Sequence, residues 1–194
     1  MKKIIVSALF ICISTAQNSV VRQFSKAFAD VAEKAKPAVV TIITDKLVSL
    51  NQFDDFGFFF YQPNIPRQRE FKTNALGSGV IVDAKKGYIL TNNHVVDEMD
   101  GIRVKLIDKR EFDATIIGTD PKTDLAVLKI DAEDLEDIDL GDSENIRVGE
   151  WVMAVGSPFS ENLSHTVTTG IVSAIGRSNI LNSGSYEDFI QTDA

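Results

Sequence analysis

Short apolar segments separated by polar turns recur along most of this chain. Ile102, Val104 and Leu106 alternate with charged residues, which is the period of a half-buried strand. The other segments of strand-like composition are residues 39–48, 79–82, 88–91, 112–116, 125–130, 151–155 and 166–173. Two of them, 125–130 and 151–155, are continuous apolar runs, so we expect these strands to be buried on both faces. Many short strands with few helix signals predict an all-β barrel or sandwich.

Residues 1–16 have the pattern of a secretory signal peptide rather than of a folded domain. Two N-terminal lysines precede the mostly apolar residues 4–13, and small residues follow at 14–16. The apolar run is too short to cross a bilayer as a mature helix. We therefore expect cleavage after Ala16 and export from the cytoplasm. The only cysteine, Cys12, would leave with the signal peptide, so the mature chain would have no disulfide.

One amphipathic helix is predicted after the cleavage site. An apolar stripe at helical spacing begins at Phe28 and ends at Ala35. Ser25 precedes the stripe as a candidate N-cap, and Pro37 stops the pattern. We therefore expect a short helix within an N-terminal helical segment of residues 17–37.

Residues 51–74 form a long segment rich in phenylalanine, between the first two predicted strands, with two prolines. Such a length is unusual for a hairpin turn and is typical of functional or disordered loops. The aromatic cluster favours a contact surface. The alternative, that the rings fold back onto the core, stays open.

Composition and charge narrow the class of protein. The 44% of hydrophobic and 25% of charged residues are ordinary globular values, which excludes wholesale disorder. The formal net charge of −8 and the pI near 4.8 argue against a nucleic-acid partner, because such a protein needs a basic face to meet phosphates. The same balance argues against a polybasic membrane surface, and we expect no integral membrane span.

The two histidines are the first candidates for chemistry. Neither His94 nor His165 has a second His or Cys ligand at helical spacing, so we expect no metal and no cofactor. General-base catalysis needs only one histidine. His94 lies in a short polar turn at a strand end, where side chains face clefts, whereas His165 lies in a strand-like stretch. Taken alone, a histidine in either place is more often a surface residue or a hydrogen-bonded structural residue than a catalytic one.

A histidine base needs a carboxylate that holds its tautomer and stabilises the imidazolium. Asp124 is the best candidate, because it stands at a junction between a turn and an apolar strand. Asp120, in the preceding turn, is the second choice.

Six motifs occur along the chain in the order known from one family. They are LGSGVI at 76–81, TNNHVV at 91–96, TDLAVL at 123–128, GSPF at 156–159, TGIVSA at 169–174 and FIQTDA at 189–194. The chain thus resembles the HtrA/Do-like (DegP/DegQ-type) serine proteases from about residue 24 to its end. This resemblance implies a chymotrypsin-like double β-barrel, with a complete first barrel over residues 38–140 and a partial second barrel over 141–194.

The resemblance also implies roles. His94 would be the general base and Asp124 its orienting carboxylate, in an endopeptidase of the periplasm that degrades unfolded or damaged proteins. The segment 51–74 is similar to the family's variable aromatic loop. The N-terminal helix resembles the segment through which family members form homo-trimers.

The family's nucleophile motif, G-N-S-G-G, follows the stretch that matches 189–194, so we expect the nucleophile to be missing from these 194 residues and the chain alone to be inactive. The stretch Asn182-Ser183-Gly184 lacks the outer glycines of that motif and precedes the stretch 189–194, and Ser78 matches a barrel strand; we therefore expect neither serine to be the nucleophile. The alternative function is a non-catalytic holdase, a binding fragment or a pseudo-enzyme.

Overall fold

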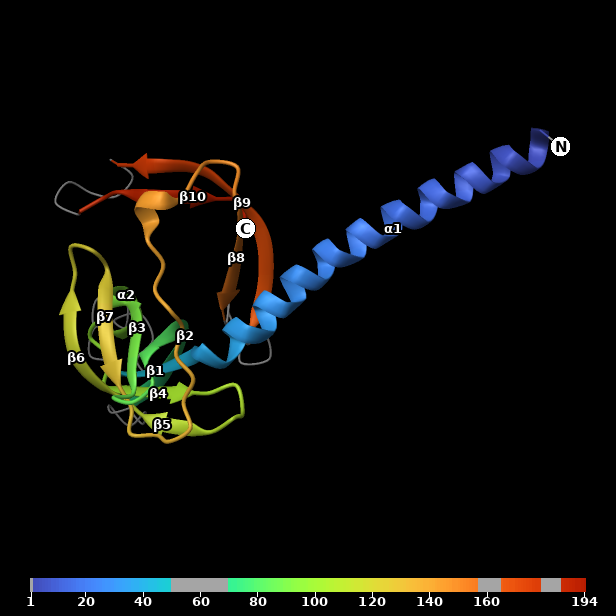
Figure 1. The fold of residues 1–194 in the computed structure, drawn as a ribbon. Coiled ribbons are helices and arrows are strands. Elements are labelled where there is room, and N and C mark those ends of the chain that lie inside the picture. The colour runs from blue at the N-terminus through green and yellow to red at the C-terminus, as the bar shows by residue number, and fades with distance from the viewer. Residues whose placement is uncertain (1, 50–69, 157–164, 179–185) are drawn as a thin grey trace, which may run out of the picture. The chain divides into compact units, whose positions relative to one another are not determined.

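The computed structural model describes residues 2–49, 70–156, 165–178 and 186–194 (Figure 1). The chain divides into two compact units, Met1–Lys36 and Pro37–Ala194. The first unit is helical, and the second contains all of the described strands. Segment 50–69, which is most of the predicted aromatic loop, and Ser183 lie outside the described residues.

The first unit consists of helix α1 (Lys2–Ala35). The helix passes through Ser25 without a break, so the prediction of an N-cap at that residue is wrong. The physical reason is that residues 2–35 contain neither glycine nor proline, so nothing in the backbone interrupts the helix. The predicted end is confirmed, because α1 stops at Ala35 and a 3₁₀ turn that contains Pro37 follows. Among the described helices, none has the length and apolar character needed to cross a membrane.

The second unit is built from two antiparallel sheets. The strands of the larger sheet are β1 (Val39–Ser49), β2 (Glu70–Asp83), β3 (Tyr88–Asn92), β4 (Gly101–Lys105), β5 (Glu111–Asp113), β6 (Thr115–Asp120) and β7 (Leu125–Lys129). They are arranged in the order β5-β4-β1-β2-β3-β7-β6 and curl around a core (Figure 1). The smaller sheet, in the order β10-β9-β8, consists of β8 (Trp151–Gly156), β9 (Thr166–Arg177) and β10 (Phe189–Thr192). The all-β prediction is therefore confirmed.

The division into a first barrel over residues 38–140 and a partial second barrel over 141–194 stays a prediction. In the described residues the larger sheet is a curled half-barrel whose outer strands are β5 and β6. The chain passes from β7 to the smaller sheet through residues 130–150, which include the predicted boundary at Gly141 and one 3₁₀ turn, Ser143–Asn145. The strand β2 begins at Glu70, so the last residues of the predicted loop 51–74 belong to a strand instead.

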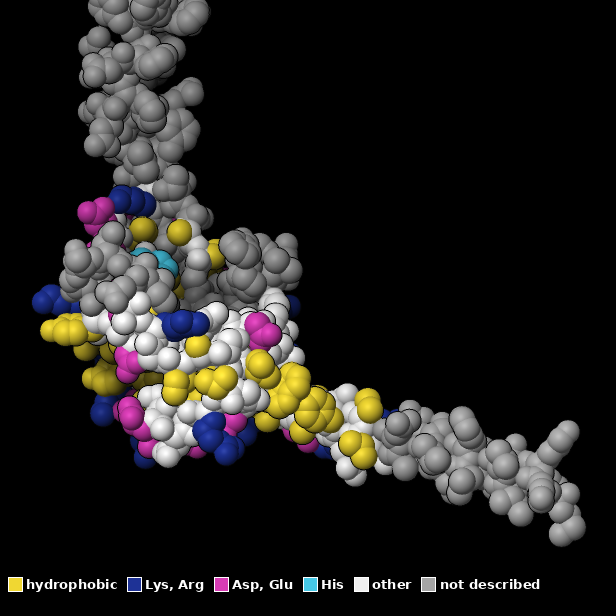
Figure 2. Space-filling view, turned by 90° about the horizontal axis from the view of Figure 1, so that it is seen from above, with side chains coloured by type: hydrophobic (Ala, Val, Ile, Leu, Met, Phe, Trp, Pro, Cys, Tyr) yellow, Lys and Arg dark blue, Asp and Glu magenta, His cyan; other side chains and the backbone are white. Residues whose placement is uncertain are grey.

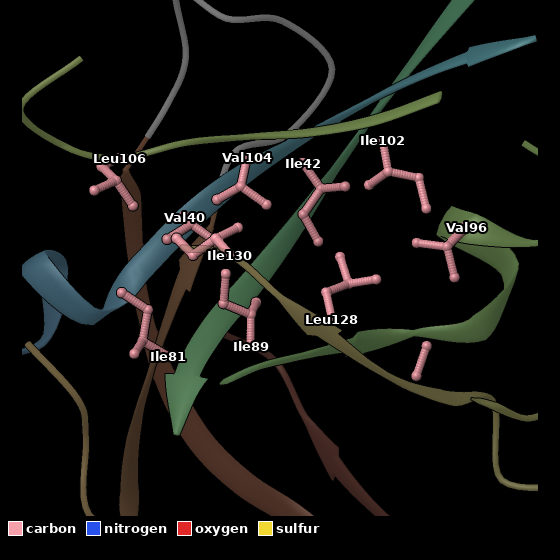
Figure 3. Close-up of a cluster of buried hydrophobic side chains, with 11 residues drawn as sticks. Val40, Ile42, Ile81, Ile89, Val96, Ile102, Val104, Leu106, Leu128 and Ile130 are labelled. Carbon is pink, nitrogen blue, oxygen red and sulfur yellow. The ribbon is translucent and has the colours of Figure 1, made fainter. Parts of the chain in front are cut away.

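The core lies inside the curl of the larger sheet. Figure 3 shows apolar side chains from several strands pointing toward one another, and α2 (Asn93–Val96) adds Val96 to them. The fully buried members include Val40 and Ile42 of β1, Ile89 of β3 and Leu128 of β7. Burying a large aliphatic side chain contributes about 1.5–3 kcal/mol, so this cluster is what holds β3 and β7 in place.

Burial differs from expectation in the two continuous apolar runs. In β7 only one face is buried: Leu128 is inside, whereas Leu125 is 43% exposed. In β8, Trp151 is 57% exposed. The strand buried on both faces is the first part of β1, where residues 39–45 are all buried. One face of β1 carries Val40 and Ile42 into the core, and β8 of the smaller sheet also contacts this strand.

Candidate active site

His94 is positioned by the end of a buried strand. After β3 the chain turns into the short helix α2, and His94 is its second residue. Val96 anchors this helix in the core with 1% of its surface exposed, while the His94 side chain is 71% exposed. The local sequence thus combines an apolar anchor with an accessible imidazole.

Asp124 reaches His94 because β3 and β7 pair side by side. The register places Asn92 opposite Leu125, so the residue before Leu125 lies next to the start of α2. Asp124 has a φ of 56°, in the left-handed region that aspartate tolerates better than most residues. Its carbonyl accepts a hydrogen bond from the Asn93 backbone N–H at 3.0 Å, which ties the turn before β7 to α2.

The two predicted site residues are in direct contact. His94 Nδ1 lies 2.7 Å from Asp124 Oδ2, and the His94 backbone N–H donates to Asp124 Oδ1 at 2.9 Å. An ionised carboxylate only accepts hydrogen bonds, so Nδ1 of a neutral ring must carry the proton. The lone pair of Nε2 is then available to accept a proton from another group.

Several contacts set the charge state of Asp124. Partial burial acts to raise its pKa, but the His94 N–H, the His94 ring and the Asn92 amide together hold the pKa below its ordinary value. Asp124 is therefore ionised at neutral pH and can stabilise a positive charge on His94.

Sequence reasoning missed Asn92. Its Nδ2 donates to Asp124 Oδ2 at 3.2 Å and to the Asp124 carbonyl at 3.1 Å. The available signal was an asparagine at the junction of a strand and a helix, where such residues usually act as caps.

The other candidate residues, His165, Asp120 and Ser78, have hydrogen-bond partners other than His94 and Asp124. His165 Nε2 is 2.9 Å from the Val39 carbonyl oxygen. This contact fits the alternative that His165 is a hydrogen-bonded structural residue. Asp120 accepts from the Lys122 N–H at 3.0 Å within its own turn, and hydrogen bonds from Thr123 and Lys122 lower its pKa. Ser78 lies inside β2, as predicted, and its carbonyl accepts from the Thr91 hydroxyl at 2.8 Å.

A cavity of about 280 Å³ adjoins the residues that flank the pair. Asn92 and Leu125 line it from the larger sheet, and Val155 lines it from β8. The two sheets approach closely here, since a Cβ on Gly156 would lie 3.0 Å from Ser78 Oγ. A concave surface between the sheets therefore lies next to Asn92 and Leu125, the residues that flank the pair.

A larger cavity of about 850 Å³ lies near the β2–β3 turn, and its side chains pair locally. Three of the four cations that line it have a carboxylate partner: Lys86 with Asp83, Arg110 with Asp108 and Lys129 with Asp131. In the described part of the chain, no three His, Cys, Asp or Glu side chains come together as a metal site requires. Figure 2 likewise shows acidic and basic side chains scattered among apolar ones on the face in view.

Comparison with known proteins gives consistent results. Residues 77–194 match a family described as the trypsin-like peptidase domain. A protein of Marinomonas sp. named "Probable periplasmic serine endoprotease DegP-like" is 46% identical over 186 residues, which are 86% of this chain and 38% of the relative. The "Periplasmic serine endoprotease DegP" of Salmonella typhimurium is 41% identical, over 93% of this chain and 42% of the relative.

Solved structures agree with these relatives. The structure titled "HtrA-type protease AlgW with decapeptide" has a TM-score of 0.67 and 43% identity, over 86% of this chain and 51% of that one. The structure titled "HtrA-type protease AlgW with tripeptide" has a TM-score of 0.68 and 41% identity, over 86% of this chain and 46% of that one. The chain thus spans less than half the length of these curated relatives and about half of these solved chains.

Proposed function

This chain belongs to the trypsin-like peptidase family, and from that premise we propose that it is part of a serine endopeptidase that degrades unfolded or damaged proteins in the periplasm. The resemblance to HtrA-type proteases predicted from the six motifs is confirmed by the similarity to relatives and solved structures of that type.

The contact between His94 and Asp124 carries the proposal. In a serine endopeptidase, Nε2 of His94 would take the proton of the attacking hydroxyl, and Asp124 would stabilise the imidazolium that forms. The 2.7 Å separation of Nδ1 and Oδ2 meets the geometric requirement for this role. The attacking hydroxyl is assigned to neither Ser78 nor Ser183.

The names of the relatives and the predicted signal peptide support the compartment, and the needs of an endopeptidase support the substrate. The names of both relatives include the word periplasmic, and the predicted signal peptide would deliver the chain to that compartment. An endopeptidase that does not unfold its substrates must accept chains that are already extended, which favours unfolded or damaged proteins. We further propose that the protein forms a homo-trimer through its N-terminal segment.

The test uses the product of the gene that carries these residues. It is incubated with unfolded casein, with and without a covalent serine-directed inhibitor, beside the variants His94→Ala and Asp120→Asn. We expect inhibitor-sensitive cleavage by the parent and by Asp120→Asn, and none by His94→Ala. Cleavage by His94→Ala would refute the assigned base. Binding of casein without cleavage by the parent would instead support the non-catalytic binding module.

A further inference from the structure

We propose that Asn92 is a positioning residue for the His94–Asp124 pair, holding the Asp124 carboxylate against the imidazole. Its amide bridges two acceptors of the same residue, Asp124 Oδ2 at 3.2 Å and the Asp124 carbonyl at 3.1 Å. A donor that grips both the side chain and the backbone of Asp124 restricts rotation of the carboxylate. The catalytic meaning of this role rests on the proposed function.

The helix α2 shows that this amide is not used as a cap. Asn92 occupies the N-cap position, with φ −83° and ψ 145°, yet its side chain makes no capping hydrogen bond. An asparagine there usually accepts from an N–H of the first helical turn. Here Asp124 serves that turn from the neighbouring strand, accepting from Asn93 N at 3.0 Å and from His94 N at 2.9 Å. The Asn92 amide is thereby left to donate to Asp124.

The distribution of donors over the carboxylate explains why this third bond matters. Oδ1 accepts from the His94 backbone, whereas Oδ2 accepts from the His94 ring and from Asn92. Without Asn92, only the ring would hold Oδ2, and the Asp124 side chain is 35% exposed to water. Water can replace the lost hydrogen bond, but it does not fix the orientation of the carboxylate.

The Asn92 amide carries no charge, which is compatible with the role of His94 as a general base. A hydrogen bond from a neutral donor favours the ionised form of Asp124 without adding charge to the site. A lysine in the same place would also donate to Asp124, but its positive charge would oppose protonation of the His94 ring. Among the described residues, the titratable side chain that contacts Asp124 is that of His94.

The experiment measures the pair directly, by NMR of the whole 194-residue chain. The Asp124 carboxyl carbon is titrated with pH, and the ring nitrogens of His94 report which nitrogen carries the proton. The variants are Asn92→Ala, which removes the donor, and Asn92→Asp, which keeps the shape but adds a like charge. The control is Asn145→Ala, because Asn145 Nδ2 also donates to a carboxylate, that of Asp142, at 2.7 Å.

We expect the Asp124 pKa to rise in Asn92→Ala and further in Asn92→Asp, with a smaller share of Nδ1–H tautomer in the alanine variant. Asn145→Ala should change neither. An Asp124 titration and a His94 tautomer in Asn92→Ala equal to those of the parent would overturn the proposal, and so would an equal change in the Asn145 control. Both readouts are independent of peptide cleavage, so this inference can fail while the proposed function stands, or survive if that function fails.

Discussion

Asp124 connects more parts of the site than any other residue described above, since it contacts His94, Asn93 and Asn92. Replacing it with asparagine keeps the shape and suits the left-handed φ of 56°. The asparagine side chain, however, can donate as well as accept a hydrogen bond, so it no longer requires the His94 ring to carry its proton on Nδ1. We expect kcat of the gene product to fall roughly 10⁴-fold, as in other triads that lose this carboxylate.

The matched control for this prediction is Asp120→Asn, the same change in the same turn but outside the pair. Casein cleavage rates and thermal unfolding of both variants check the effect. A loss of activity with Asp120→Asn as large as with Asp124→Asn would show that the turn, and not the carboxylate, is what matters.

The lowered pKa of Asp124 also predicts a pH dependence of stability. A carboxylate whose folded pKa lies below its unfolded value stabilises the fold above the unfolded value, near 3.9, and this contribution is lost as pH falls through the folded pKa. The gap in urea midpoint between the parent and Asp124→Asn should therefore be largest at neutral pH and shrink below about pH 4. A gap that stays constant with pH would contradict this.

At the residue scale, motif order was enough to predict the contact between His94 and Asp124, but not the hydrogen bonds that Asn92 adds to it. The first two residues belong to motifs whose members have characteristic roles. The role of Asn92 depends on the register that sets it opposite Leu125, and on Asp124 supplying the helix cap. Neither fact is visible in local sequence, where an asparagine before a helix indicates a cap.

At the element scale, the seating of α2 depends on a close approach to β2. A Cβ on Gly77 would lie 2.5 Å from Val95 Cγ1, and the branched valine has little freedom to move. We expect Gly77→Ala to displace α2 and to cost about 1–3 kcal/mol of unfolding free energy, as overpacking usually does. Urea unfolding and the His94 ring-nitrogen shifts measure both effects.

Two further variants separate crowding from backbone effects. Adding Val95→Ala to Gly77→Ala should restore part of the stability, because it removes the colliding methyl groups. Gly118→Ala is the control, since a Cβ there meets nothing within 4 Å. Equal destabilisation by the two glycine substitutions would contradict the packing argument.

The strands themselves could be predicted from the sequence, but their burial could not. Alternation located β4, and turn residues located the hairpin of β2 and β3. The apolar run of β7 suggested burial on both faces, yet the sheet has its core on one side of that strand only. Which face is covered depends on the curl of the sheet and on what packs outside it, and β1 is buried on both faces where the core lies on one side and β8 also contacts the strand.

At the scale of the whole molecule, the helix α1 suggests how copies associate. Val20, Phe24 and Val31 are 65%, 48% and 55% exposed in the single chain, and their spacing places them on one helical face. Such an apolar stripe is stabilised when it packs against another copy. The proposed trimer would bury this stripe.

We therefore expect Val20→Asp combined with Val31→Asp to convert the trimer to a monomer, because each new carboxylate would be desolvated inside the interface. The control is Lys26→Ala, which removes an exposed ion pair with Asp30 at 2.7 Å; water and salt screen such a pair, so its loss should leave the assembly unchanged. The parent and the variants are prepared as chains that begin at Gln17. Light scattering after size-exclusion chromatography measures the mass of each. A parent that is monomeric, or a double variant that stays trimeric, would rule out assembly through this stripe, while the geometry of His94 and Asp124 within one chain would be unaffected.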